Sequence, residues 1–173
     1  MPTAATDWSQ FRYCPKCGSG AITCRGKKLT CQACSLVFYI NPTLSVVAVI
    51  TDTQGRILVA TRGQDPAKGA WDLPGGFMDP GENAEQALAR EIKEELGVNL
   101  TIKQYLGTAP NVYLYKGITY NTVDIAFLCQ IDTPETIQPD DDITDASFVQ
   151  VNETNIDRFA FPSIRHFAQM FMS

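Results

Sequence analysis

The chain has 173 residues, of which 45% are hydrophobic, and a formal net charge of −5 at pH 7. This length can hold one well-packed domain and a small additional module. No apolar run approaches the ~20 residues of a membrane-spanning helix, and the N-terminus lacks the layout of a signal peptide. We therefore expect a cytoplasmic protein without a membrane segment.

Two C-x₂-C pairs lie near the N-terminus. Cys14 and Cys17 form the first pair, Cys31 and Cys34 the second, and thirteen residues separate them. This spacing is typical of a four-cysteine zinc ribbon, in which each pair turns both thiolates toward one ion. A redox C-x-x-C is not expected twice, and disulfides are disfavoured without an export signal. We predict a zinc ribbon at residues 12–38 whose four thiolates close the coordination sphere.

The predicted ribbon is basic, whereas the rest of the chain is acidic. Residues 12–41 contain no acid and five basic residues, Arg12, Lys16, Arg25, Lys27 and Lys28; residues 42–173 contain nine basic and eighteen acidic residues. A basic ribbon is compatible with nucleic-acid binding, because phosphate contacts dominate such binding. Few aromatic residues lie between Cys14 and Cys34, however, and five such charges are also ordinary for a surface. Both interpretations stay open.

The chain after Asn41-Pro42 alternates between strand-like and helical segments. Residues 43–52 read as a central strand, which Gln54-Gly55 turns into a hairpin with residues 56–63. One helix follows, opening at Glu82 or Asn83 and ending before Gly97. Further segments are expected as strands near 100–108, 112–116, 119–131 and 145–150 and as an amphipathic helix at 161–171. This order predicts a mixed sheet with helices on both faces.

The central helix carries an unusual acidic strip, Glu91, Glu94 and Glu95. Their spacing places them on one face, where like charges repel, and at the helix end that disfavours anions. A solvated acidic face is one explanation. The strip also borders a predicted apolar stripe of Leu88, Ile92 and Leu96. Carboxylates at such an edge suit Mg²⁺, which takes oxygen ligands from carboxylates, water and substrate phosphates.

Residues 76–98 resemble the Nudix box, in which glycine, five residues, glutamate, seven residues and R-E-U-x-E-E-x-G-U are required (U is aliphatic). Its fixed positions are occupied by Gly76, Glu82, Arg90, Glu91, Glu94, Glu95 and Gly97, with Ile92 and Val98 at the aliphatic positions. The preceding WDLPGGF resembles the usual entry into the box. The resemblance covers roughly residues 40–170 and implies an α/β fold, the Nudix α/β/α sandwich.

The resemblance also implies a reaction: hydrolysis of a nucleoside diphosphate linked to another moiety, with Mg²⁺ or Mn²⁺ bridging the diphosphate. By this resemblance, Glu91, Glu94 and Glu95 bind metal, and Glu82 orients Arg90. Asp142, in DITDASFV, stands where the family often supplies another acidic metal or base residue, although an ordinary solvated loop is equally compatible with it. We expect His166, the only histidine, to have a packing or surface role, so a covalent mechanism lacks a candidate nucleophile.

A zinc ribbon joined to a Nudix box is similar to the NADH pyrophosphatase branch of the family. That branch has an S-Q-P-W-P-F-P signature after the box, where residues 107–115 here read GTAPNVYLY. We therefore place ADP-ribose-like substrates first and dinucleotides such as NADH or FAD second. Candidate substrate contacts are Gly75, Gly76, Tyr113 and Tyr115, although the two rings could equally belong to the core.

The alternative class is a non-enzymatic protein that senses a nucleotide or binds RNA on a Nudix scaffold. Erosion of the box glutamates would mark such a protein, and none is eroded. A homodimer is compatible with the sequence, which does not fix the oligomeric state.

Overall fold

The computed structural model describes Trp8 and residues 11–172 of the chain. The N-terminal residues, in which we expect no signal peptide, lie mostly outside this described part. The described residues form two compact units: those up to residue 42 together with 112–121, and residues 43–111 together with those from 122 onward. The domain limits expected from the sequence, 12–38 and 40–173, remain a prediction.

The first unit contains a small antiparallel sheet. Its strands are β1 (Ile22–Arg25), β2 (Lys28–Cys31) and β3 (Val37–Tyr39), paired in the order β1-β2-β3. Side chains alternate between the two faces of these strands, as the pleat requires. Leu29 and Cys31 are buried, whereas Lys28 is exposed. One face of the sheet therefore faces solvent.

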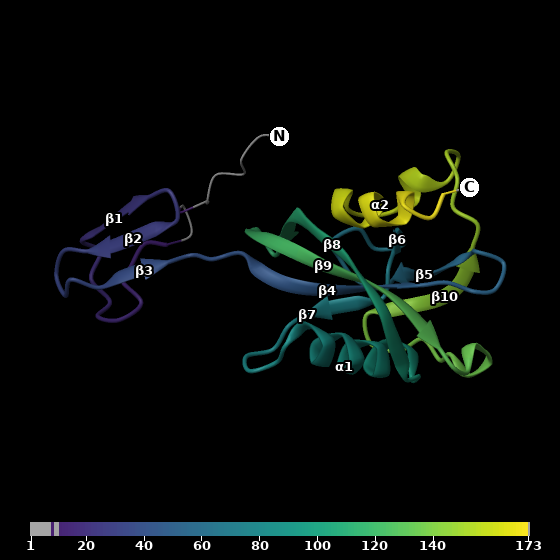
Figure 1. Ribbon diagram of the computed structural model, residues 1–173. Coiled ribbons are helices and arrows are strands. Elements are labelled where there is room, and N and C mark those ends of the chain that lie inside the picture. Colours follow the sequence, from purple (N-terminus) through teal and green to yellow (C-terminus); the bar gives the residue numbers. More distant parts are fainter. Residues whose placement is uncertain (1–7, 9–10, 173) are drawn as a thin grey trace. The chain divides into compact units, whose positions relative to one another are not determined.

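The second unit is an α/β sandwich built on a mixed sheet (Figure 1). Strand β4 (Thr43–Ile50) lies between β7 (Gly75–Phe77), which is antiparallel to it, and β9 (Ile118–Ile131), which is parallel. The outer strand beside β9 is β8 (Leu100–Tyr115), and the end of β8 and the start of β9, at residues 112–121, belong to the first unit. A second sheet has the order β10-β5-β6 and comprises β5 (Ile57–Arg62), β6 (Trp71–Asp72) and β10 (Ile143–Val149).

Within its described residues, this unit also has two α-helices and two short 3₁₀ turns. They are α1 (Ala84–Leu96), α2 (Pro162–Gln169) and the turns Pro134–Thr136 and Ile156–Arg158. Helices α1 and α2 lie on opposite sides of the mixed sheet (Figure 1). The predicted mixed sheet with helices on both faces is thus confirmed.

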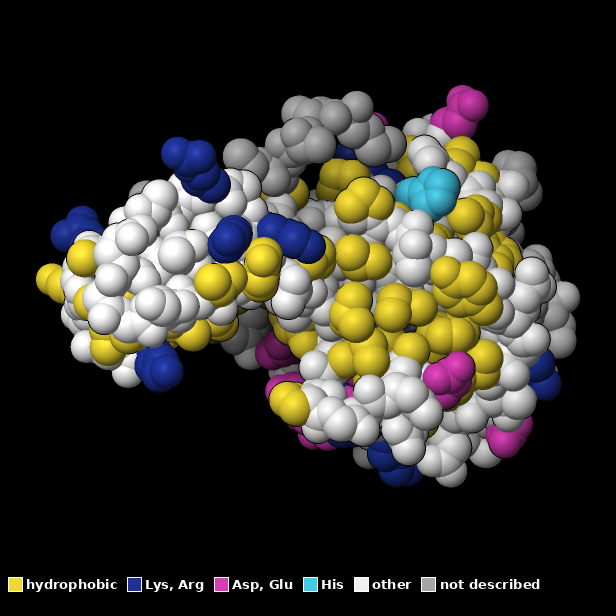
Figure 2. Space-filling view, turned by 60° about the vertical axis from the view of Figure 1, so that its left-hand side comes forward, with side chains coloured by type: hydrophobic (Ala, Val, Ile, Leu, Met, Phe, Trp, Pro, Cys, Tyr) yellow, Lys and Arg dark blue, Asp and Glu magenta, His cyan; other side chains and the backbone are white. Residues whose placement is uncertain are grey.

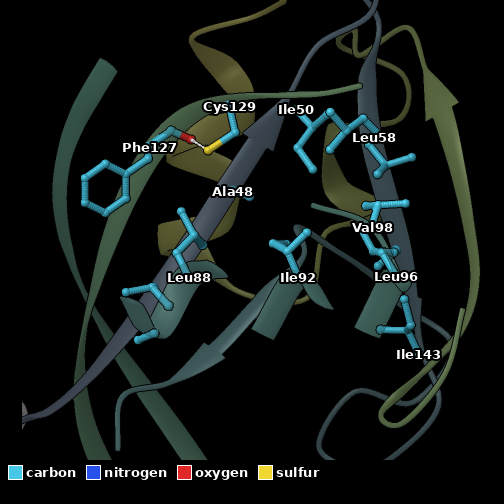
Figure 3. Close-up of a cluster of buried hydrophobic side chains, with 14 residues drawn as sticks. Ala48, Ile50, Leu58, Leu88, Ile92, Leu96, Val98, Phe127, Cys129 and Ile143 are labelled. Atoms are coloured by element: carbon cyan, nitrogen blue, oxygen red, sulfur yellow. Dashed lines mark hydrogen bonds between the residues drawn. The ribbon is translucent and has the colours of Figure 1, made fainter. Parts of the chain in front are cut away.

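The apolar strands β4 and β5 divide their side chains between two cores. Because successive residues point to opposite faces, Val46, Ala48 and Ile50 pack toward α1, whereas Val47 and Val49 join the core around α2. Figure 3 shows the α1 side, where Leu88, Ile92 and Leu96 project onto the sheet. All three are fully buried, which confirms the predicted apolar stripe.

Helix α1 begins and ends where its capping residues predict. Asn83 is the N-cap and forms a reciprocal capping box with Gln86, which satisfies free backbone N–H groups. Gly97 ends the helix in the left-handed conformation with φ 73°, which glycine adopts without steric cost. The box glutamates therefore sit on a helix whose limits are fixed by local sequence.

Two strand predictions need correction. The predicted hairpin of residues 43–52 and 56–63 closes only at its base, through the bridge between Thr51 and Ile57, after which β4 and β5 enter different sheets. The predicted segments 100–108 and 112–116 are one continuous strand, β8. Proline at position 110 does not interrupt it, because an outer strand can accommodate a residue that lacks a backbone donor.

His166, for which we expected a packing or surface role, is exposed on α2 and contacts the ring of Phe167. No helix of the described residues has the length and apolarity needed to cross a membrane.

Candidate active site

Gly75, the first residue of β7, contacts the acidic end of helix α1. The backbone N–H of Gly75 donates to Glu95 Oε2 at 2.9 Å. Gly75 has φ 144°, and a Cβ there would lie 2.0 Å from the carbonyl oxygen of Val46. No other residue type fits this position without moving β4, so the contact that fixes Glu95 depends on glycine.

Arg90 is held by contacts from three directions. Its Nε and Nη2 donate to the two oxygens of Glu82 at 2.8 and 2.9 Å, so the supporting contact expected between these residues is present. Nη1 donates to Glu91 Oε1 at 2.8 Å and Glu94 Oε2 at 3.0 Å, and Nη2 also donates to the carbonyl of Phe77 at 3.0 Å. One guanidinium thus fixes two box carboxylates and offsets their mutual repulsion.

The Arg90 contact sets the protonation of Glu82. Hydrogen bonds from Arg90 lower the pKa of Glu82 to about 2, against an ordinary value of ~4.3. A carboxylate whose pKa is lower in the folded state than in the unfolded state stabilises the fold at any pH above its unfolded pKa. This stabilisation is lost as the pH falls through the folded-state pKa. The ion pair therefore stabilises the fold fully at neutral pH, and this stabilisation is lost between about pH 4.3 and pH 2.

We expect Glu82→Gln to lower the urea midpoint of unfolding at pH 7, because the charged partner of Arg90 is lost. The difference from the wild type should shrink as the pH falls toward 2, where Glu82 itself becomes neutral. Urea titrations at pH 7 and pH 3 measure this, with Glu85→Gln, at an exposed position of the same helix, as the matched control. A difference that is independent of pH would contradict this role of the ion pair.

Gly76 makes room for the carboxylate of Glu91. A Cβ at position 76 would lie 2.5 Å from the carboxyl carbon and Oε2 of Glu91 and 2.6 Å from its Oε1. These atoms end a flexible side chain, so the carboxylate can move aside while the backbone remains in place.

We therefore expect Gly76→Ala to separate activity from stability. Stability should change by only about 1 kcal/mol, the scale of one lost hydrogen bond. Turnover should fall about 100-fold, because Glu91 is displaced from its contact with Arg90. Gly20→Ala is the control, since the nearest atom to a Cβ there is 3.8 Å away. Equal activity of the two variants would contradict the need for close contact at position 76.

The three strip carboxylates differ in burial. Glu95 is 6% exposed, and desolvation by burial raises its pKa to about 8, with Asp72, Glu91 and Asp142 adding like-charge repulsion. Burial also raises the pKa of Glu91, whereas the side chain of Glu94 is 50% exposed. Protein groups satisfy only part of these carboxylates: the second oxygen of each accepts no hydrogen bond from the described residues. These oxygens are available to a cation or to water.

The loop that carries Asp142 is anchored to the C-terminal end of α1. The N–H groups of Gln138 and Asp140 donate to the carbonyls of Leu96 and Glu95, each at 3.0 Å. Asp142 Oδ1 accepts a hydrogen bond from Gln64 at 2.6 Å. The charge of its neighbour Asp141 contributes to the raised pKa of Glu91, and burial together with the charges of Asp142 and Glu94 raises the pKa of Asp141 itself.

The strip and Asp142 do not converge as tightly as the cysteines do. Among the described residues, only the four cysteines bring at least three candidate ligand atoms within 4.8 Å of one another. A looser set of carboxylates suits Mg²⁺ rather than zinc, because Mg²⁺ keeps several waters and takes only one or two carboxylates. Metal binding by Glu91, Glu94, Glu95 and Asp142 remains a prediction.

The sequence reasoning missed a buried acid beside the site, Asp72. Burial raises its pKa to about 6 even though Arg62 donates to it at 2.6 Å. Asp72 lies three residues before Gly75, whose N–H donates to Glu95, and its charge also raises the pKa of Glu95. Asp72 lies in the WDLPGGF segment before the box, and this position was the feature of the sequence that could have indicated a role near the site.

A second missed acid, Asp124, interrupts the apolar strand β9. It is 4% exposed and accepts hydrogen bonds from Ser45 on β4 and Ser163 on α2. The neighbouring hydroxyl of Thr122 is buried without a partner among the described residues. A charged residue within an otherwise apolar strand was the only sequence signal for this polar cluster.

Tyr113 and Tyr115, the other predicted substrate contacts, lie at the end of β8 in the first compact unit. Their ring centroids are 6.3 Å apart, and Tyr115 is 38% exposed beside Lys116. Their substrate role stays a prediction.

The cysteine cluster in the first unit has the geometry of a tetrahedral metal site. Cys14 and Cys34 have sulfurs 3.7 Å apart, as do Cys17 and Cys31. Thiolates at ~2.3 Å from a central zinc form a tetrahedron with sulfur–sulfur edges of about 3.8 Å. The N–H of Lys16 also points at Cys14 Sγ, at 3.4 Å. The four residues could therefore hold one zinc ion.

Comparison with known proteins places this geometry in context. The family model for the NUDIX domain matches residues 41–170. An ADP-ribose pyrophosphatase of Methanocaldococcus jannaschii is 33% identical over 71% of the chain and 69% of its own length. An NAD-capped RNA hydrolase of Stutzerimonas stutzeri is 36% identical over 58% of the chain, which spans only 36% of that relative.

The fold is also that of a solved structure. A NUDIX hydrolase from Nitrosomonas europaea superposes with a TM-score of 0.72 over 93% of this chain and 90% of its own, at 23% sequence identity. The α/β/α sandwich implied by the sequence resemblance is thereby confirmed.

Proposed function

The chain belongs to the Nudix family, and from this premise we propose that it hydrolyses the diphosphate bond of a nucleoside diphosphate linked to another moiety. ADP-ribose-like compounds are the first substrate class and dinucleotides such as NADH or FAD the second. The observation that carries this proposal is the intact contact set of the box. Arg90 joins Glu82, Glu91 and Glu94, while Gly75 fixes Glu95.

The two named relatives support this substrate order. The archaeal ADP-ribose pyrophosphatase aligns over more than two thirds of both chains, whereas the bacterial NAD-capped RNA hydrolase is matched over about a third of its length. The similarity to the ADP-ribose pyrophosphatase thus covers a larger share of the relative's length. NAD-capped RNA remains within the same chemical class, because its cap also contains a nucleoside diphosphate link.

Some residues of the site would bind the metal ion, and others hold the metal-binding carboxylates in position. A bound Mg²⁺ or Mn²⁺ would neutralise the diphosphate and polarise its phosphorus toward attack by water. Glu91, Glu94 and Glu95 would supply its protein oxygens, and Asp142 is a further candidate from its loop. Arg90 positions Glu91 and Glu94, and Glu82 positions Arg90. The missing side chain at Gly76 makes room for the carboxylate of Glu91, and the N–H of Gly75 holds Glu95.

The cysteine cluster supports a separate structural zinc site. Four thiolates would close its coordination sphere, so no position remains for a reactive water. Thiolates in this state require a reducing compartment, which supports a cytoplasmic location. A homodimer is part of the proposal only as a state to be tested by light scattering.

A substrate panel tests the proposed activity. The full chain, loaded with zinc, is incubated with ADP-ribose, NADH, FAD, dinucleoside polyphosphates and nucleoside triphosphates, each with Mg²⁺ and with Mn²⁺. We expect nucleoside monophosphate release to be fastest from ADP-ribose. The absence of cleavage for every compound, with folded zinc-loaded protein, would exclude the proposal and favour a non-enzymatic nucleotide sensor.

A further inference from the structure

The solvent-facing side of the ribbon sheet has a distinctive composition. The register pairs Arg25 with Lys28 and Lys28 with Tyr39, so these three residues form one row across β1, β2 and β3. Side chains directly opposite each other on neighbouring strands lie on the same face, with Cβ atoms about 4.5–5.5 Å apart. All three are exposed, and Tyr39 retains 47% of its accessible surface. Two cations and one aromatic ring therefore lie side by side.

A shallow depression lies on this face. Its volume is about 220 Å³, and it is lined by Thr23, Arg25, Lys28, Thr30 and Gln32. Every lining residue carries a hydrogen-bond donor, and none carries an acidic group. Gln32 and Thr23 are joined by a hydrogen bond of 3.4 Å. The depression is therefore suited to an anion with several oxygen acceptors.

The basic side chains of this face have no acidic partner in the described part of the chain. Among the described residues, neither Arg25 nor Lys28 forms an ion pair, and residues 12–41 contain no acidic residue. The space-filling view shows dark blue basic side chains over the ribbon at the left (Figure 2). Lys27, which the sequence does not distinguish from Lys28, lies in the turn between β1 and β2, outside the depression.

We propose that this face, Thr23, Arg25, Lys28, Thr30, Gln32 and Tyr39, binds the backbone and bases of a single-stranded nucleic acid. Phosphates would accept from Arg25 and Lys28, and a base would stack on Tyr39, the combination that single-strand-binding proteins use. A duplex keeps its bases stacked internally, so the ring would have no free base to bind. This site uses none of the residues assigned to the proposed hydrolytic site.

Fluorescence anisotropy of a labelled oligouridylate tests the face. The probe has no diphosphate link, so it cannot be a substrate of the proposed reaction. We expect the zinc-loaded full chain to bind it with a Kd on the order of 10⁻⁵ M at moderate salt, because charge dominates such contacts. We expect Arg25→Ala/Lys28→Ala to reduce the slope of log K against log salt by about 1.4, or ~0.7 for each lost phosphate contact.

The matched control removes two charges elsewhere on the ribbon. Lys16→Ala/Lys27→Ala has the same net charge as the test variant but leaves the depression intact, so its salt slope should stay near that of the wild type. Tyr39→Ala should weaken binding about tenfold with an unchanged slope, and Tyr39→Phe should restore it. Zinc content is measured for every variant, so that loss of the ribbon fold is recognised.

Three outcomes would overturn the inference: no binding by the wild type, equal loss in the control variant, or equal affinity for a duplex and for the single strand. Binding of phosphate or a mononucleotide as tight as that of the oligonucleotide would also overturn it, because a polymer contact would then be unnecessary. Hydrolysis of ADP-ribose by the wild type is measured separately. Activity without oligonucleotide binding would overturn this inference and leave the proposed function in place.

Discussion

Glu95→Gln should reduce diphosphate hydrolysis by about 10³-fold and, at the same time, make the magnesium-free protein more stable at pH 8. The loss of activity is the magnitude expected when one preorganised charge-stabilising group is removed from a site. The gain in stability follows from burial: Glu95 is 6% exposed, and its pKa is raised to about 8. Glutamine keeps an oxygen that can accept from the N–H of Gly75, so the fold should persist.

The raised pKa of Glu95 determines how the stability difference between the wild type and Glu95→Gln changes with pH. An unfolded glutamate ionises near pH 4.3, whereas folded Glu95 holds its proton until about pH 8. Between these values the folded state binds more protons than the unfolded state, so wild-type stability decreases as pH rises. The stabilising effect of Glu95→Gln should therefore grow from about pH 4.3 to pH 8 and remain constant above it.

Urea unfolding in magnesium-free buffer at pH 5 and pH 8, followed by fluorescence of the buried Trp71, measures this effect. Glu85→Gln is the control, because it removes a carboxylate from an exposed position of the same helix. Adding Mg²⁺ should stabilise the wild type more than the variant, since only the wild type retains all the strip carboxylates. If the variant keeps full activity, Glu95 does not take part in the chemistry.

The helix and its acidic strip could be predicted because the signals are local. A capping residue, an apolar stripe at helical spacing and a terminal glycine specify α1 from within its own sequence, and Leu88, Ile92 and Leu96 are buried as expected. The spacing of Glu91, Glu94 and Glu95 follows from the same periodicity. The register of one helix fixes which of its side chains share a face.

The arrangement of the strands could not be read in the same way. The turn at Gln54-Gly55 correctly predicts a chain reversal, but pairing beyond Thr51 and Ile57 depends on strands far along the chain. β4 pairs with β9 and β7, and β5 with β10 and β6. These partners are selected by the two cores that share the side chains of β4 and β5. No local pattern distinguishes this outcome from a longer hairpin.

The contacts of buried polar groups also could not be predicted from the sequence. Asp124 satisfies its oxygens with Ser45 and Ser163, which lie 79 and 39 residues away in sequence. Likewise, Asp72 meets Arg62 only because β5 and β6 pair. In the sequence alone, each acid is an isolated charged residue with no identifiable partner. In the folded chain each acid accepts hydrogen bonds from residues that are distant in sequence or on a neighbouring strand, and burial raises the pKa of Asp72.

Cys31→Ser should abolish metal binding at the ribbon and unfold its three-stranded sheet. Cys31 is 1% exposed, and its sulfur lies 3.7 Å from that of Cys17, so a shorter serine side chain cannot complete the tetrahedron. Structural zinc contributes an apparent ~10–16 kcal/mol to small zinc domains, far more than a sheet of eleven residues can supply by packing. Zinc content should fall from about one equivalent to none, and protease cleavage should appear within residues 12–40.

Cys24→Ser provides the matched control. Cys24 is half-buried on β1 in the same sheet but is not among the four clustered cysteines, so this variant makes the same chemical change without removing a ligand. It should retain zinc, and after replacement by Co²⁺ it should show the absorption of a tetrahedral cobalt thiolate site, which Cys31→Ser should lack. Equal zinc content in the two variants would contradict the assignment. We propose that zinc stabilises the ribbon rather than the hydrolytic site, so ADP-ribose cleavage should survive in Cys31→Ser while the ribbon fold is lost.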